Sequence, residues 1–256
     1  MRGVRAFALD GRTRLVERRG EVRSLCIVRR NWRNARRTEL HQTHGVAGGS
    51  ARAEYDRRRR RDEARVLRDH PRVGKLIVAV RGEPQSTRAW EQGAVGEERV
   101  GARLDELRSS GSVVLHDRRI PGTRANIDHI VVATSGVWVV DTKHYRGQVS
   151  RRDVGGVFRR DVRLYVRGRD RTKLVTAMTA QVLAVHQALP GTAVVVKPAL
   201  CFTAAEWSWF AAPFEVQGVV VTWPRALVKS IRTATSSGID VASVGSELAE
   251  RLPAAS

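Results

Sequence analysis

The sequence predicts an α/β fold, in which helices pack on both faces of a mixed β-sheet. The chain has 256 residues, of which 42% are hydrophobic, and this is enough for a buried core. Residues 126–133 and 136–143 are two β-rich runs that only Thr134 and Ser135 separate, which is typical of a hairpin. Helical patterns come both before and after these runs. This order favours a sheet with helices on its faces.

The first 88 residues carry most of the charge excess. The formal net charge is +20, with 24 basic and 10 acidic residues in 1–88 (+14) and 22 and 16 in 89–256 (+6). A basic surface attracts nucleic acid, although a GC-rich genome also favours arginine codons. We expect three parts: a disordered Arg-rich N-terminus over 1–50, a basic helix and linker over 51–88, and the folded domain with C-terminal helices over 89–256.

The N-terminal 50 residues show no sustained helix or strand period and end in a Gly-rich segment over 45–50. We also consider that translation starts at Val46, which would make residues 1–45 foreign to the native protein. Residues 51–70 read as a polar helix that ends at Pro71. Its run of arginines, Arg57–Arg61, is interpreted either as a solvated face or as a phosphate-binding one.

The remaining elements follow from periodicity and from turn residues. The apolar residues at 100, 104 and 107 have helical spacing. We expect helices over 90–109, 172–189, 224–233 and 240–252, strands over 112–116, 193–203 and 214–222, and further Arg-rich strands within 145–167.

Two acids and a lysine lie at the ends of the predicted hairpin strands. Side chains at i and i+2 share a strand face, so Asp141 and Lys143 point the same way, and Asp128 lies on the paired strand. Glu97 lies on the apolar stripe of the first domain helix. Its simpler interpretation is a first-turn carboxylate stabilised by the helix dipole.

Carboxylates that converge in this way can bind a divalent cation. Two or three of them hold Mg²⁺, or Mn²⁺, while waters and phosphate oxygens complete the shell. Such an ion polarises a phosphate and activates water. We expect Asp128, Asp141 and Glu97 as metal ligands, and Lys143 as the ammonium that orients the nucleophile.

Several ordered motifs resemble one known family. They are Gly93–Val100, Leu115–Asp117, Asn126–Val132 and Gly136–Lys143. Together they are similar to the nuclease-related domain (NERD) family of the PD-(D/E)xK nuclease superfamily.

The resemblance implies a restriction-endonuclease-like fold with Glu97, Asp128, Asp141 and Lys143 at the catalytic positions. It also places Gln181 on a glutamine position of the superfamily, although Gln181 also reads as a hydrogen-bonded amide at the edge of the core. Two positions depart from the common pattern, because Ile127 stands where the motif is named for proline and Asp141 stands where glutamate is more frequent.

The expected function is therefore metal-dependent hydrolysis of DNA, with RNA as the second choice of substrate. The alternative is a nucleic-acid-binding module of the same fold that does not cut, and a scaffold without nucleic-acid affinity is a third possibility. With no membrane-spanning run or secretory signal, we expect a cytoplasmic protein. His129 and His144 are expected to pack or contact substrate, and Trp207 and Trp209 to pack or, less simply, to stack on bases.

Overall fold

The computed structural model describes residues 8–9, 13–14, 44–81, 84–156 and 159–255. The N-terminus over 1–50, which we expect to be disordered, lies mostly outside these described residues. So does nearly all of the segment before Val46, the alternative start of translation. The chain divides into residues 1–40 and 41–256. In the first unit, β1 (Ala8–Leu9) and β2 (Thr13–Arg14) pair antiparallel. The second unit contains the acids that the sequence singles out, Glu97, Asp128 and Asp141.

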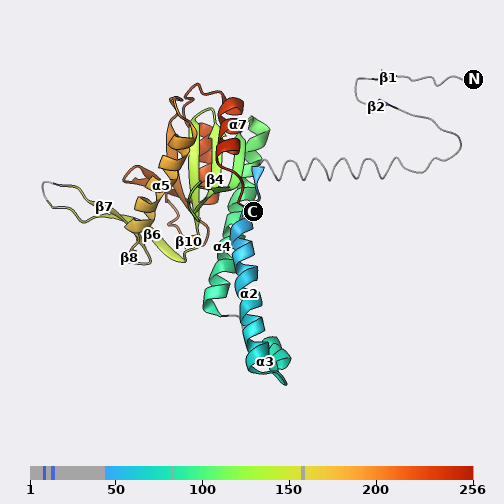
Figure 1. Cartoon of the computed structure of the whole chain (residues 1–256). Coiled ribbons are helices and arrows are strands. Elements are labelled where there is room, and N and C mark those ends of the chain that lie inside the picture. Colours follow the sequence, from blue (N-terminus) through green and yellow to red (C-terminus); the bar gives the residue numbers. More distant parts are fainter. Residues whose placement is uncertain (1–7, 10–12, 15–43, 82–83, 157–158, 256) are drawn as a thin grey trace, which may run out of the picture. The chain divides into compact units, whose positions relative to one another are not determined.

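A six-stranded mixed sheet forms the centre of this unit (Figure 1). Its order is β11-β12-β9-β5-β4-β3. The strands are β3 (Val113–Arg119), β4 (Asn126–Ala133), β5 (Gly136–Lys143), β9 (Val196–Phe202), β11 (Phe214–Val216) and β12 (Val219–Thr222). Strands β3, β4 and β5 form an antiparallel meander, and β5 pairs in parallel with β9. The predicted mixed α/β fold is confirmed.

The hairpin of β4 and β5 is buried on both faces because helices cover both. On one face, Val137 and Val139 belong to the core formed with α5 (Thr172–Ala188) and α7 (Val241–Arg251). On the other face, Trp138 and Val140 pack in the core formed with α4 (Gln85–Asp105) and α6 (Pro224–Thr233). Gly136 has φ 119°, a backbone conformation that the tight turn requires and that glycine adopts without strain.

A second, smaller sheet follows the hairpin in sequence. Its order is β10-β6-β7-β8, from β6 (Gly147–Asp153), β7 (Val162–Val166), β8 (Arg169–Asp170) and β10 (Ala205–Glu206). Figure 1 shows that β6, β7 and β8 form an arm beside α5. This arm is the Arg-rich hairpin region that the sequence predicts over 145–167.

Helix α2 (Gly49–Asp69) lies along α4, as Figure 1 shows. The ion pair between Arg52 and Glu98 (2.7 Å) joins the two helices. The Arg58 guanidinium also lies 5.1 Å from the centre of the Trp90 ring. The predicted basic helix therefore packs against the first helix of the domain.

The segment between these helices differs from the expected linker. Residues Gly74–Val80 form a short helix, α3, because the apolar stretch within the predicted linker is long enough for two turns. Helix α4 begins earlier than predicted, at Gln85, since Pro84 provides the extended residue before the helix. It ends in a 3₁₀ turn, η1 (Glu106–Ser110).

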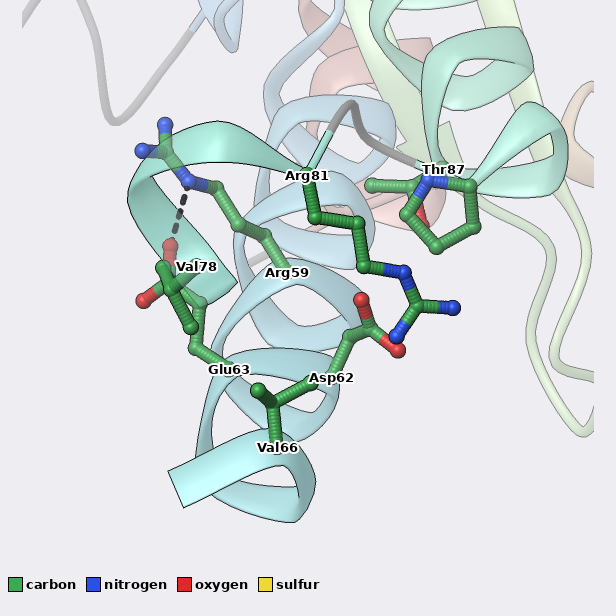
Figure 2. Close-up of a pocket in the computed structure, with 8 residues that line it drawn as sticks. Arg59, Asp62, Glu63, Val66, Val78, Arg81 and Thr87 are labelled. Atoms are coloured by element: carbon green, nitrogen blue, oxygen red, sulfur yellow. Dashed lines mark hydrogen bonds and ion pairs between the residues drawn. The ribbon is translucent and has the colours of Figure 1, made fainter. Parts of the chain in front are cut away.

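A small polar cavity lies where α2, α3 and the start of α4 meet (Figure 2). It measures about 90 Å³. Arg59 and Glu63 form an ion pair of 2.9 Å in its wall, and Val66 and Val78 line it as well. None of the acids that the sequence singles out lines this cavity. No described helix is long and apolar enough to cross a bilayer.

Candidate active site

Asp128 and Asp141 lie on neighbouring strands at the same end of the β4–β5 pair. The register pairs His129 with Val140, so its continuation puts Asp128 opposite Asp141. The Asp128 Oδ2 atom accepts a hydrogen bond of 2.7 Å from the backbone N–H of Thr142. Burial, reinforced by repulsion from Asp141 and Glu97, raises the pKa of Asp128 well above its usual value.

Lys143 binds the second acid directly. Its Nζ atom donates to Asp141 Oδ1 at 2.8 Å. The Asp141 side chain is only 8% exposed and that of Lys143 is 25% exposed, so water screens the pair weakly. Burial opposes the charge of the lysine, but the carboxylates of Asp141 and Asp128 outweigh it and raise the pKa of Lys143. The lysine therefore remains an ammonium.

Glu97 reaches the same cluster from α4. A Cβ atom at Gly96 would lie 3.0 Å from the Thr203 Oγ1 atom, so the glycine permits a close approach of α4 to the residues that follow β9. Burial, and then the charges of Asp117 and Asp141, raise the pKa of Glu97 to about 7, although Lys143 opposes the shift. Glu97, Asp128, Asp141 and Lys143 are thus electrostatically coupled.

The simpler interpretation of Glu97, as a first-turn carboxylate, is wrong. Helix α4 begins at Gln85, so Glu97 lies more than three turns into the helix. The favourable effect of the helix dipole is confined to the first turn. Another source of stabilisation is needed for this charge.

Asp117 is a buried acid that the sequence reasoning missed as a site residue. The register pairs His116 with His129 and Arg118 with Ile127, so Asp117 occupies the position opposite Asp128. Its φ of 48° is left-handed, which turns the side chain out of the regular strand alternation. Its Oδ2 atom accepts from the Ser50 backbone N–H at 2.6 Å.

This contact connects the start of α2 to the sheet. The Asp117 Oδ1 atom also accepts from Asn126 Nδ2 at 3.0 Å, and the Ser50 hydroxyl donates to the same oxygen. A carboxylate at a helix N-terminus is stabilised by the free N–H groups there. The signals in the sequence are the position of Asp117 directly after the strand predicted over 112–116 and its place in the Leu115–Asp117 motif.

A cleft of about 1010 Å³ opens beside the acids. Glu97 and Asp128 are in its wall. Arginines line the same space: Arg57 and Arg60 from α2, Arg119 from the end of β3, and Arg124 from the β3–β4 connection. Two arginines of the run Arg57–Arg61 thus line the same cleft as Glu97 and Asp128, and phosphate binding by this run stays a prediction.

The structure does not connect Gln181 to the acids by a hydrogen bond. Gln181 lies on α5, and its Oε1 atom is buried without a hydrogen-bond partner among the described residues. The alternative of a hydrogen-bonded amide is therefore not seen at this oxygen. The role of Gln181 in the site stays a prediction.

Of the two histidines next to the acids, His129 packs in the core, while His144 is only half-buried. His129 is fully buried, and its Nδ1 atom lies 2.9 Å from His116 Nδ1. His144 Nδ1 lies 3.2 Å from the Thr203 Oγ1 atom. The alternation that the sequence predicts thus places His129 in the core beneath α4.

The carboxylate oxygens of these acids are ligands of the kind that a hard divalent cation prefers. Asp128 and Asp141 provide carboxylate oxygens, and burial together with repulsion from the neighbouring acids raises the pKa values of Asp128 and Glu97. No three acid, histidine or cysteine side chains of the described part of the chain meet closely enough to form a complete cage. Mg²⁺ is usually held by one or two carboxylates together with waters and phosphate oxygens, so a complete cage is not required.

The part of the chain that holds these acids is similar to a known protein family. The model of a family described as nuclease-related domain matches residues 92–203. An uncharacterized protein of Bacillus anthracis is 37% identical over 79 residues, which cover 28% of this chain and 37% of that protein. The chain thus matches little more than a third of the length of this relative. No solved structure matches. The matched residues include Glu97, Asp128, Asp141, Lys143 and Gln181.

Proposed function

Since residues 92–203 belong to the nuclease-related domain family, we propose that this chain is a metal-dependent nuclease that hydrolyses phosphodiester bonds of DNA. One observation carries the proposal. Glu97, Asp128, Asp141 and Lys143 come from α4, β4 and β5 and interact electrostatically beside a cleft lined with arginines. Acidic ligands, an ammonium and a cationic approach are the elements that phosphodiester hydrolysis needs.

Asp128 and Asp141 would hold the Mg²⁺ or Mn²⁺ ion, and Glu97 would bind it directly or through water. The ion supplies polarisation of the phosphate and a more acidic bound water. The chain's own residues do the rest. The Thr142 N–H fixes the Asp128 carboxylate, and Asp141 keeps Lys143 protonated so that its ammonium can orient the nucleophile or neutralise charge on phosphorus.

The four arginines of the cleft would bind the nucleic-acid backbone. Arg57 and Arg60 come from α2, Arg119 comes from the end of β3 and Arg124 from the connection to β4. Contacts of this kind position a substrate without reading its sequence. We therefore expect cleavage that depends on salt and metal and has little base preference.

A binding module that does not cut is the second candidate. Lys143 is held on Asp141 at 2.8 Å, and the described acids form no complete cage, which would suit a site that no longer turns over. Such a module would use the same cleft for the same backbone contacts.

Cleavage assays separate the two candidates. Plasmid DNA and single-stranded DNA are incubated with the full chain in Mg²⁺, Mn²⁺ or EDTA, and Asp141→Asn and Lys143→Met are compared with the wild type. Glu250→Gln, an exposed acid of α7, is the matched control. A nuclease gives metal-dependent products that both site variants lose and the control keeps. Salt-sensitive binding without products in any protein would instead identify the binding module.

A further inference from the structure

Two aromatic side chains stand almost fully in solvent on one loop. Trp209 is 95% exposed and Phe210 is 93% exposed, more than any other large hydrophobic side chain of the described residues. They occupy the central positions of a β-turn that the hydrogen bond from Ala211 N to Ser208 O closes at 2.9 Å. Adjacent exposed aromatic rings are unfavourable in water and commonly mark a binding surface.

The base of this loop is anchored. Trp207 packs against Trp223, with 4.7 Å between ring centres, and against Phe214, with 6.2 Å. The loop is also tied to the candidate site, because the Thr203 backbone N–H donates to the Lys143 carbonyl oxygen at 3.1 Å. Fixed packing at Trp207 thus holds the turn with Trp209 and Phe210 away from the core, and Thr203, six residues before Trp209, connects this part of the chain to the backbone of Lys143.

The small sheet next to this loop is rich in arginine. Strand β10 pairs in parallel with β6, so the loop begins beside the small sheet. Residues 146–171 contain nine arginines and three aspartates, a net charge of +6. The Arg151 guanidinium lies 5.6 Å from the centre of the Phe214 ring, so cationic and aromatic groups meet in one surface. Seven arginines of this segment have no carboxylate partner among the described residues: Arg146, Arg151, Arg152, Arg159, Arg167, Arg169 and Arg171.

We propose that Trp209 and Phe210 stack on unpaired bases, and that the preferred substrate is therefore single-stranded DNA or a single-stranded flank. This inference rests on the proposed nuclease function and specifies its substrate class. In a duplex, base faces are covered by neighbouring pairs and only edges are open in the grooves. In a single strand each base offers a ring face, while arginines bind the backbone. Exposed rings on a loop that begins beside an Arg-rich sheet match that chemistry.

Binding without cleavage tests the inference. Fluorescence anisotropy in EDTA measures the affinity of the full chain for a labelled thymidine oligonucleotide of about 15 nucleotides and for a blunt duplex of equal length. The test variant is Trp209→Ala/Phe210→Ala. The conservative variant is Trp209→Tyr/Phe210→Tyr, and Leu183→Ala, an exposed apolar residue of α5, is the control.

We expect the double alanine variant to bind the oligonucleotide about tenfold or more weakly, since each stacked ring contributes substantially to affinity. Duplex binding should change less than about threefold, and the tyrosine variant and the control should both behave like the wild type. Unchanged oligonucleotide binding, or an equal loss for the duplex, would overturn the inference. A double alanine variant that loses binding only to phosphatidylserine vesicles would also overturn the inference. Exposed aromatic residues and arginines also suit a membrane surface.

The outcome is separable from that of the proposed function. If the wild type never cuts but the alanine variant loses the oligonucleotide selectively, the stacking surface stands and the nuclease proposal fails. If the wild type cuts with metal and the variant binds both ligands normally, the nuclease proposal stands and the stacking surface fails.

Discussion

The carboxylate of Asp128 is oriented by the backbone N–H of Thr142, which donates to its Oδ2 atom at 2.7 Å across the β4–β5 pair. The bond turns the carboxylate toward the strand end that carries Asp141 and Lys143. Because a backbone group provides this contact, the orientation depends on strand pairing and on no other side chain. The Asp128 charge and its position can therefore be changed separately.

Asp128→Asn should remove the charge and keep the position. The amide oxygen can still accept from Thr142, so the fold is retained, while the loss of a charged metal ligand should lower metal-dependent cleavage about 100-fold or more. Circular dichroism and cleavage rates check the two parts. Full activity in Asp128→Asn would contradict the assignment of this residue as a ligand.

Lys143→Met should lose cleavage and also lower stability. The variant leaves the Asp141 carboxylate, which is 8% exposed, without its ammonium partner. Breaking a fully buried pair costs about 3–5 kcal/mol, and the partial exposure of Lys143 reduces our expectation to about 1–3 kcal/mol. Urea unfolding measures the change. Lys143→Met/Asp141→Asn should recover part of the stability without recovering cleavage, and a double variant no more stable than the single one would argue against the ion pair.

The sequence predicts both strands of the central hairpin and their bounds, because the signals for them lie within one short segment. Strands β4 and β5 have the predicted bounds, since the β-rich runs and the turn residues Thr134, Ser135 and Gly136 all lie within one segment. The helices α5, α6 and α7 also follow closely from their apolar spacing and their flanking residues. Local pattern is sufficient for these elements.

The parts that the sequence does not predict depend on contacts between distant residues. The interaction of Asp117 with Ser50 joins positions 67 residues apart, and neither residue has a local pattern that indicates it. The same holds for Arg57 and Arg60, whose place in the cleft depends on how α2 packs along α4. Only the start of α4 at Gln85 had a local signal, in Pro84.

The ionisation of Glu97 should make metal-free stability depend on pH. Burial, with Asp117 and Asp141, raises its pKa from 4.5 to about 7, so between these values the folded state binds more protons than the unfolded state. This group therefore costs stability as pH rises from 4.5 to 7, and the full cost is present above 7.

Glu97→Gln removes that cost. At pH 8 in EDTA the variant should be more stable than the wild type by on the order of 2 kcal/mol, and the difference should disappear near pH 4. Urea unfolding at several pH values measures this, with Glu250→Gln, an exposed acid of α7, as control. An advantage for Glu97→Gln that is as large at pH 4 as at pH 8 would point to a cause other than ionisation.

The cleft arginines should act through phosphate contacts. Arg57→Ala/Arg60→Ala should weaken DNA binding by a similar factor for unrelated sequences and make the salt dependence shallower by about 0.9 per lost contact on duplex DNA. Binding at several salt concentrations provides both quantities. Arg232→Ala, on α6 away from this cleft, is the control. An unchanged salt slope in the double variant would show that α2 does not contact the backbone.

The most direct test is anomalous diffraction at the manganese edge from crystals of the full chain soaked in Mn²⁺ above pH 7, where Glu97 is ionised. If these acids form a metal site, we expect a manganese peak about 2.0–2.3 Å from carboxylate oxygens of Asp128 and Asp141. Glu97 should lie in the same coordination shell or be bridged to it by water. Saturating Mn²⁺ with no peak at these carboxylates, or with a peak only at other residues, would contradict this metal site.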